Sequence, residues 1–150
     1  MTRCFASHSR LALLVPAALL LTGMSAAGAL AQIKLYNPIS LEPNKEVSDT
    51  LTEKDIPTGQ GGFARDYTLD MTEGDQVAID LSSESFDSIV SLLAEDGSTV
   101  AENDDGPDGS TNSLLFARIA KTGTYIIRVR AFGETGVGTF KLKVTRLRPV

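Results

Sequence analysis

Apolar residues alternate with polar ones in several short runs of this chain. The clearest runs have their apolar residues at Val77, Ile79 and Leu81, at Tyr125, Ile127 and Val129, and at Phe140, Leu142 and Val144. A period of two places one side of a strand in a core and the other side in solvent. The ranges 64–69 and 113–119 repeat this pattern, and turns rich in Gly and Asp separate the runs. The pattern predicts an all-β sandwich of antiparallel strands.

One apolar run does not have the period of a strand. Phe86, Ile89, Val90, Leu93 and Ala94 follow the three- and four-residue spacing of an amphipathic helix. Two β-branched residues and the neighbouring serines disfavour a helix here. From these residues alone, helix and strand both stay open.

The N-terminus has the organisation of an export signal. Arg3 and Arg10 give a basic start, an apolar run follows, and Ala29-Leu30-Ala31 is a small-x-small cleavage site. The apolar run, residues 11–21, is too short for a helix that spans a membrane, which needs about 20 residues. A lipoprotein signal would require a cysteine where Met24 stands, so we expect neither a lipid nor a stable membrane anchor.

Cleavage after Ala31 defines the expected organisation of the chain. Residues 1–31 are the signal peptide, residues 32–44 are an extended lead-in that contains two prolines, and residues 45–150 are one domain. The mature chain then holds 12 basic residues against 19 acidic ones, a net charge of −7. This balance disfavours nucleic acid as a partner, because phosphate binding relies on clustered Lys and Arg.

The signal peptide also contains Cys4 and His8, the only cysteine and the only histidine. A Ser-His-Asp triad needs an imidazole, a papain-like site needs a thiolate, and zinc sites commonly use both side chains. We therefore predict no catalytic residues and no residues that bind an organic cofactor. Carboxylates that a secreted hydrolase could use are present, but nothing in the sequence pairs them across a cleft; they are Asp66, Asp70, Asp80 and Asp87.

The densest polar cluster lies at residues 103–109. Asn103, Asp104 and Asp105 begin it, and their amide and carboxylate oxygens are ligands that Ca²⁺ prefers. The spacing does not match an EF-hand loop, because the twelfth position from Asp104 is Leu115. A surface turn capped by Asx side chains explains the same residues, so the turn and the calcium site stay open.

Two strands of the C-terminal half carry basic residues on one face. If they pair, they would form one positive patch for an acidic partner; otherwise each is an ordinary solvated face. The residues are Arg128 and Arg130 on one strand and Lys141 and Lys143 on the other.

Several segments, taken in order, are similar to one family. They are Leu51 with Asp55, Asp66-Tyr67-Thr68-Leu69, Gly74-Asp75-Gln76-Val77-Ala78-Ile79, Phe86-Asp87-Ser88, Leu92, Gly97, Asn103-Asp104-Asp105, Ser113-Leu114-Leu115, Gly123-Thr124-Tyr125-Ile126-Ile127-Arg128-Val129 and Gly138-Thr139-Phe140-Lys141-Leu142. The series resembles the bacterial pre-peptidase C-terminal domain over about residues 45–145.

The resemblance implies a jelly-roll-like antiparallel β-sandwich of about eight strands, with a strand at Asp87 to Glu95. It also implies a non-catalytic accessory domain of secreted bacterial peptidases, and related domains in clostridial collagenases bind collagen and calcium. Asp87, Asn103, Asp104 and Asp105 match recurring acidic positions of the family, which makes them the candidate calcium ligands. From the sequence we expect neither a peptidase domain nor a counterpart of the acidic linker of the collagen-binding relatives.

We therefore expect an exported bacterial module, periplasmic or extracellular, that has no enzyme activity. Its expected partner is a protein or an extracellular polymer, with a secreted protease among the candidates, and calcium is the candidate cofactor. The alternatives are a protease-associated or carboxylate-dependent secreted hydrolase and a structural protein of the cell envelope. The identity of the partner and the oligomeric state stay open.

Overall fold

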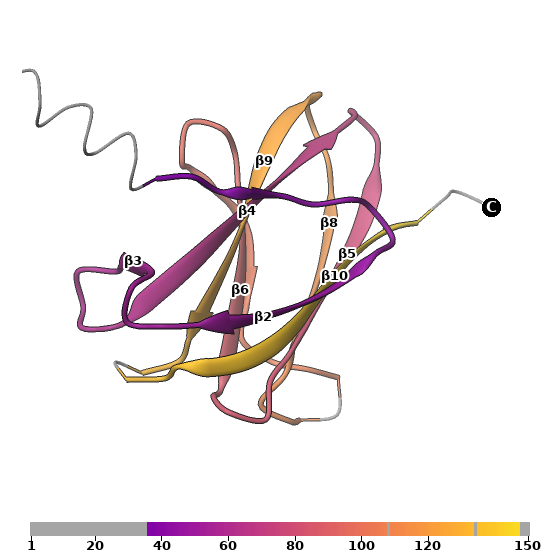
Figure 1. The fold of residues 1–150 in the computed structure, drawn as a ribbon. Coiled ribbons are helices and arrows are strands. Elements are labelled where there is room, and N and C mark those ends of the chain that lie inside the picture. Colours follow the sequence, from indigo (N-terminus) through magenta and orange to yellow (C-terminus); the bar gives the residue numbers. More distant parts are fainter. Residues whose placement is uncertain (1–35, 108, 134, 148–150) are drawn as a thin grey trace, which may run out of the picture.

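The computed structural model describes residues 36–107, 109–133 and 135–147, so the predicted signal peptide lies outside the described residues (Figure 1). The described residues form ten strands, eight of them with five residues or more, in agreement with the predicted number. They are β1 (Ile39–Ser40), β2 (Glu46–Leu51), β3 (Ile56–Pro57), β4 (Phe63–Met71), β5 (Gln76–Ser82), β6 (Ser88–Leu93), β7 (Thr99–Asn103), β8 (Ser113–Arg118), β9 (Gly123–Ala131) and β10 (Gly138–Leu147). No helix in these ranges is long and apolar enough to cross a membrane.

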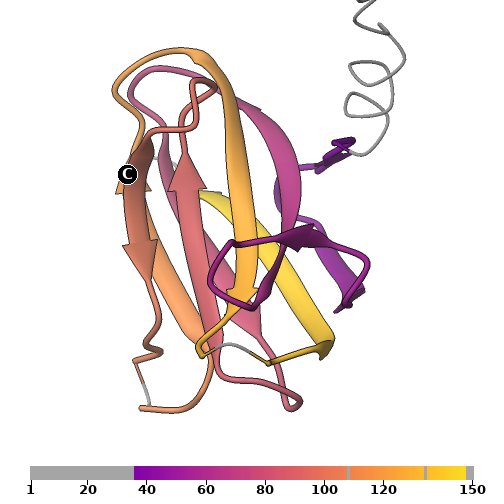
Figure 2. The same cartoon turned by 90° about the vertical axis from the view of Figure 1, so that its left-hand side faces the viewer.

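The strands form two sheets that enclose one core. Sheet A has the order β1-β4-β9-β6-β7, with β3 also beside β4, and sheet B has the order β2-β10-β5-β8. β1 runs parallel to β4, and every other pair is antiparallel. Figure 2 shows β1 to β3 at one edge of the sandwich and β7 with β8 at the opposite edge. The predicted antiparallel β-sandwich is confirmed, and β1 lies within the expected lead-in.

The predicted alternation decides which side chains enter the core. Val77, Ile79 and Leu81 of β5 are buried, and the residues between them are exposed or half-buried. β9 and β10 alternate in the same way. Each of these strands therefore has one core face and one face toward solvent, as the period of two requires.

The segment with helical spacing is strand β6. It lies between β9 and β7 inside sheet A, and all six of its residues are buried. Its outward residues Ile89, Ser91 and Leu93 lie beside segment 56–60 and the long side chains of β9. A strand buried on both faces needs no polar alternation, which explains why its apolar pattern resembled that of a helix.

Three aromatic rings connect the two sheets. Phe140 of β10 packs edge-on against Tyr67 of β4 and against Phe86, with ring centroids 6.3 Å apart in both pairs. All three side chains are buried, which confirms the core position that the alternation predicts for Phe140. Edge-to-face packing is a preferred geometry for aromatic pairs, so these contacts hold the sheets at one spacing.

Gly138, at the start of β10, is expected to tolerate no side chain. Its φ angle is +139°, and a Cβ atom there would lie 2.3 Å from the Cβ of Ser85. The backbone strain alone costs about 1–3 kcal/mol, so Gly138→Ala should lower the free energy of unfolding by at least that amount. Urea unfolding checks the prediction. Gly123→Ala is the control, because nothing lies within 4 Å of a Cβ at that position; equal loss in both variants would contradict the explanation.

Candidate binding surface

A row of polar side chains crosses the outer face of sheet A. The strand register places Asp66 of β4 opposite Arg128 of β9, and Arg128 opposite Ser91 of β6. Ser91 in turn lies opposite Glu102 of β7. Residues directly opposite each other on one face of a sheet are within reach of side-chain contact. We call Asp66, Arg128, Ser91 and Glu102 the polar row.

One end of the polar row is a buried ion pair. Arg128 donates through Nε and Nη2 to the two carboxylate oxygens of Asp66, at 2.8 Å each. The Asp66 side chain is 1% exposed and that of Arg128 is 34% exposed. The Tyr36 hydroxyl donates a further bond of 3.1 Å to Asp66. The hydrogen bond to Asp66 raises the pKa of Arg128, and burial together with the same carboxylate raises the pKa of Tyr36.

The other end of the polar row is centred on Glu102. Its Oε2 accepts a hydrogen bond of 2.6 Å from the Ser91 hydroxyl and lies 2.8 Å from Nη2 of Arg130. The hydroxyl bond, and then Arg130, lower the pKa of Glu102 from its usual value. Glu102 is therefore held as an anion by two neighbouring strands.

Glu102→Gln is expected to remove a stabilisation that depends on pH. The pKa of Glu102 is depressed only in the folded chain, so its contribution is present above the unfolded pKa and is lost as the pH falls through the folded one. In urea unfolding the wild type should exceed the variant at about pH 7, and the difference should shrink at about pH 3. Glu95→Gln, at an exposed position, is the control for the loss of one surface carboxylate. If wild type and variant differ in stability by the same amount at both pH values, the hydrogen bond and ion pair of Glu102 do not stabilise the fold as described.

A groove of about 340 Å³ lies over Arg128, Ser91 and Glu102 of the polar row. Segment 56–60 forms one wall of the groove. Gly97 of the β6–β7 turn and Thr99, the first residue of β7, form the other wall, and the floor includes Arg128 and Glu102. A second hollow, of about 410 Å³, lies between β3 and β1 above Asp66. Both volumes fall within the usual range for ligand pockets. The outer face of sheet A is therefore hollowed on both sides of β3.

The single basic patch considered from the sequence is not formed. β9 and β10 lie in different sheets and do not pair. Arg128 and Arg130 are neutralised by Asp66 and Glu102, while Lys141 lies 3.9 Å from Glu46 on sheet B. The four basic residues face two opposite sides of the sandwich, so they cannot attract one acidic partner together.

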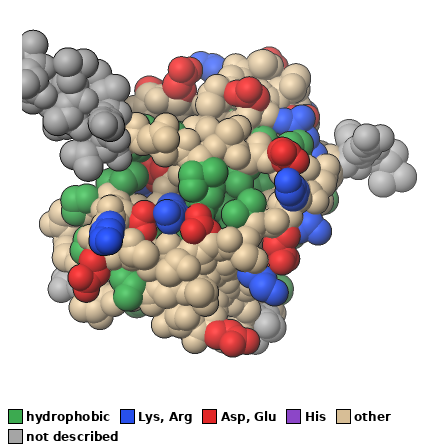
Figure 3. Space-filling model, in the orientation of Figure 1, with side chains coloured by type: hydrophobic (Ala, Val, Ile, Leu, Met, Phe, Trp, Pro, Cys, Tyr) green, Lys and Arg blue, Asp and Glu red, His purple; other side chains and the backbone are tan. Residues whose placement is uncertain are grey.

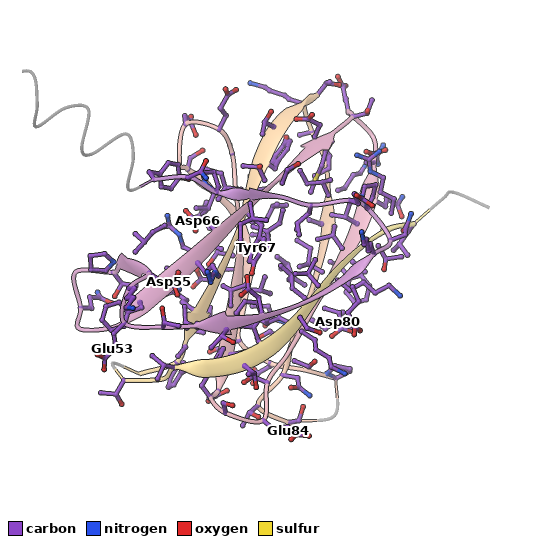
Figure 4. All side chains as sticks on the ribbon, in the orientation of Figure 1. Glu53, Asp55, Asp66, Tyr67, Asp80 and Glu84 are labelled. Atoms are coloured by element: carbon purple, nitrogen blue, oxygen red, sulfur yellow. The ribbon has the colours of Figure 1, made fainter. Side chains whose placement is uncertain are left out.

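A second charged cluster closes the open side of the sandwich between β4 and β2. The buried Tyr67 hydroxyl donates to Asp49 at 2.8 Å, and burial followed by this bond raises the pKa of Tyr67. Arg65 lies 3.4 Å from Asp49 and 3.6 Å from Asp55. Figure 3 shows acidic and basic side chains next to one another on this face, and Figure 4 places Tyr67 at its centre. Each charge has an opposite partner, so we interpret the cluster as structural.

The carboxylates considered for hydrolysis have separate surroundings. Asp66 is paired with Arg128, and Asp70 accepts a bond of 2.7 Å from Thr124. Asp80 is exposed on sheet B, and Asp87 is exposed between β5 and β6. The four residues are spread over both sheets and a loop, and the structure joins no two of them by a hydrogen bond among the described residues.

The candidate calcium ligands lie at the end of the sandwich near the β7–β8 loop. Asn103 donates to the carbonyl oxygens of Asp105 at 2.9 Å and Leu114 at 2.8 Å. Asp104 and Asp105 are exposed in the same loop, and Asp87 lies in the loop before β6. Among the residues that the structure describes, no group of three Asp, Glu, His or Cys side chains is placed to hold a metal ion. Calcium binding stays a prediction.

Comparison with known proteins agrees with this architecture. Residues 64–131, from β4 to the end of β9, match the model of the bacterial pre-peptidase C-terminal domain. This part of the chain is similar to a pre-peptidase C-terminal domain. The resemblance found in the sequence is thereby confirmed, and β10 and β1 to β3 lie outside the matched range. No curated protein matches the sequence.

Solved structures show the same fold. The pre-peptidase C-terminal domain of a collagenase from Bacillus anthracis is similar with a TM-score of 0.54 and 17% identity, over 73% of this chain and 95% of that one. The periplasmic inhibitor of g-type lysozyme, PliG, from Aeromonas hydrophila has a TM-score of 0.51 and 14% identity, over 73% and 96%. PliG from Salmonella Typhimurium has a TM-score of 0.50 and 11% identity, over 75% and 100%.

The sequence indicates only two residues of the polar row, Asp66 and Arg128. Ser91 and Glu102 have no sequence signal, since a serine in an apolar run and a glutamate in a turn-rich stretch are common. The charge of Arg128 is evident from the sequence, but its partner is not. The sequence does show opposite charges at outward positions of predicted strands. Which of these charges meet cannot be inferred without the order of the strands in the sheet.

Proposed function

We propose that the chain is an exported, non-catalytic binding module that uses the outer face of sheet A. The observation that supports this most is the polar row, in which each charged group has a partner on an adjacent strand. Side chains held in place by paired strands lose little freedom when a ligand arrives, which favours binding. The family match to accessory domains of secreted peptidases supports the same function.

The chemistry of the groove favours a protein segment as the ligand. Its lining combines apolar Ile56, Pro57 and Leu93 with Ser, Thr and Gln side chains, and it contains no aromatic residue. Sugar polymers are commonly bound on aromatic platforms, whereas an extended peptide needs hydrogen-bonding groups beside small apolar surfaces. Since the arginines are already paired, we propose a peptide segment without strong net charge.

Blocking the groove tests this proposal. Thr99→Trp places a large side chain in the groove wall, and Lys143→Trp places the same side chain on the outer face of sheet B. Proteins captured from the periplasm and medium of the producing organism by the wild type should also be captured by Lys143→Trp and lost with Thr99→Trp. Equal capture by both variants would contradict binding at this groove.

The alternative of a secreted hydrolase makes a different prediction. Purified chain should then hydrolyse protein or glycan substrates, and Asp66→Asn, Asp80→Asn or Asp87→Asn should abolish the activity. Because two proteins of the same fold inhibit g-type lysozyme, inhibition of that enzyme is assayed in parallel. Inhibition that Thr99→Trp removes would identify the partner, and turnover by the purified chain would refute the non-catalytic proposal.

Calcium binding by Asp87, Asn103, Asp104 and Asp105 is proposed separately from the groove. Neighbouring carboxylates repel one another, so a bound cation should stabilise the loop. The site predicts a melting temperature that rises in calcium and no longer rises after Asp104→Asn. An unchanged melting temperature at about millimolar calcium, the weak end of the range for extracellular sites, would contradict it.

A further inference from the structure

Strand β8 is the open edge of sheet B. It pairs with β5 on one side, and no strand of the described residues pairs with its other side. An open edge presents backbone N–H and C=O groups that another strand can bind. What covers this edge therefore decides whether the chain associates.

The chain covers the first half of this edge itself. The Leu114 N–H donates to the carbonyl of Asp105 at 3.1 Å, and the Leu114 carbonyl accepts from the Asn103 side chain at 2.8 Å. Asn103 and Asp105 thus take the place of a neighbouring strand at Leu114. The backbone of Leu114 consequently points away from β5.

The second half of the edge is open. Backbone groups of successive residues point to alternate sides of a strand, so those of Phe116 and Arg118 point the same way as those of Leu114. Residue Ile119 agrees with this alternation, because its backbone bonds back to Gly74 and Asp75. The structure gives no hydrogen-bond partner to the backbone of Phe116 or Arg118 among the described residues. The Phe116 side chain is 63% exposed beside them.

We propose that a second copy of the chain pairs with this half of β8 in the antiparallel direction, with Ala117 facing Ala117 of the second copy on the two-fold axis. Phe116 then lies opposite Arg118 of the second copy. The pairing forms four backbone hydrogen bonds and uses the four open groups of each chain. It also places each exposed phenyl ring beside a guanidinium group, which is a favourable cation–π arrangement.

The neighbouring registers fit less well. Centring the pairing on Phe116 would place Arg118 opposite Leu114 of the second copy, whose backbone groups already bond to Asp105 and Asn103. Centring it on Arg118 would place two like charges opposite each other, which destabilises a strand pair. β8 ends at Arg118, so the paired stretch stops before the covered Leu114. The proposal is independent of the groove, which lies on sheet A.

Sedimentation of the purified chain tests the association. The wild type should show the mass of two chains in a fraction that rises over about 1–200 µM, as mass action requires. Phe116→Pro removes an N–H that β5 does not use, so it should abolish the dimer and keep the strand. Phe116→Ala, which keeps both backbone groups, should weaken the dimer less. A single-chain mass for the wild type, or a dimer unaffected by Phe116→Pro, would overturn the proposal.

Cross-linking tests the register without relying on a proline. In a Cys4→Ser background, Ala117→Cys should form a covalent dimer on oxidation, because facing residues of a non-hydrogen-bonded pair lie about 4.5 Å apart at Cα, within the range of a disulfide. Glu53→Cys, an exposed position at the opposite edge of the sandwich, is the matched control and should stay monomeric. Equal cross-linking of the two variants would refute the register.

Discussion

Phe140→Ala is expected to lower the free energy of unfolding by about 3–5 kcal/mol, the range found when a buried phenylalanine is truncated. The ring is 3% exposed and packs edge-on against Tyr67 of the other sheet and against Phe86. Its removal leaves a cavity between the sheets, because the strands on both sides are held by their ladders and cannot collapse into it. Urea or thermal unfolding measures the change.

Two variants separate this cavity from a general loss of apolar surface. Phe132→Ala removes the same side chain at a position that is 58% exposed, and it should change the free energy of unfolding by no more than about 0.5 kcal/mol. Phe140→Leu keeps most of the volume and should be clearly less destabilising than Phe140→Ala. A Phe132→Ala effect as large as that of Phe140→Ala would show that packing between the sheets is not the cause.

Asp66→Ala is expected to destabilise the chain by about 2–3 kcal/mol, because removing one partner of a buried ion pair leaves the other charge uncompensated. The expected loss is smaller than the about 3–5 kcal/mol found for fully buried pairs, since Arg128 is 34% exposed and can recover part of its hydration. The Tyr36 hydroxyl loses its acceptor as well. Denaturant unfolding at neutral pH provides the measurement.

Asp70→Ala is the matched control for this prediction. Asp70 lies on the same strand and on the same face, but it is exposed and its carboxylate accepts a single bond, from Thr124. Its removal should cost less than about 1 kcal/mol, as for most surface contacts. If the two aspartates contribute equally, the Asp66–Arg128 pair does not hold β4 to β9 as described.

Most of the fold could be predicted from the sequence because it depends on local alternation. The pattern of Val77, Ile79 and Leu81 is sufficient to identify β5, and the same holds for β9 and β10. β6 could not be identified in this way, since a strand that is buried on both faces has no polar side to reveal its period. The resemblance to the family identified that strand correctly.

The candidate surface was much harder to predict than the fold. Asp66 and Arg128 are 62 residues apart in the sequence, and Ser91 comes between them along the chain. Their contact exists because β4, β9, β6 and β7 are neighbours in sheet A in an order that differs from their order in the chain. No pattern within one strand contains that order.

The sequence by itself determined that β5, β9 and β10 form and which of their faces enter the core. It also places the only Cys and the only His in the first ten residues. The tertiary structure alone decided which charges meet, because strand order and register bring distant residues together. It placed Arg128 and Arg130 beside carboxylates instead of beside Lys141 and Lys143. It also left half of β8 open while the chain's own Asn103 covers the other half. Alternation is a property of neighbouring residues, whereas pairing is a property of the whole fold.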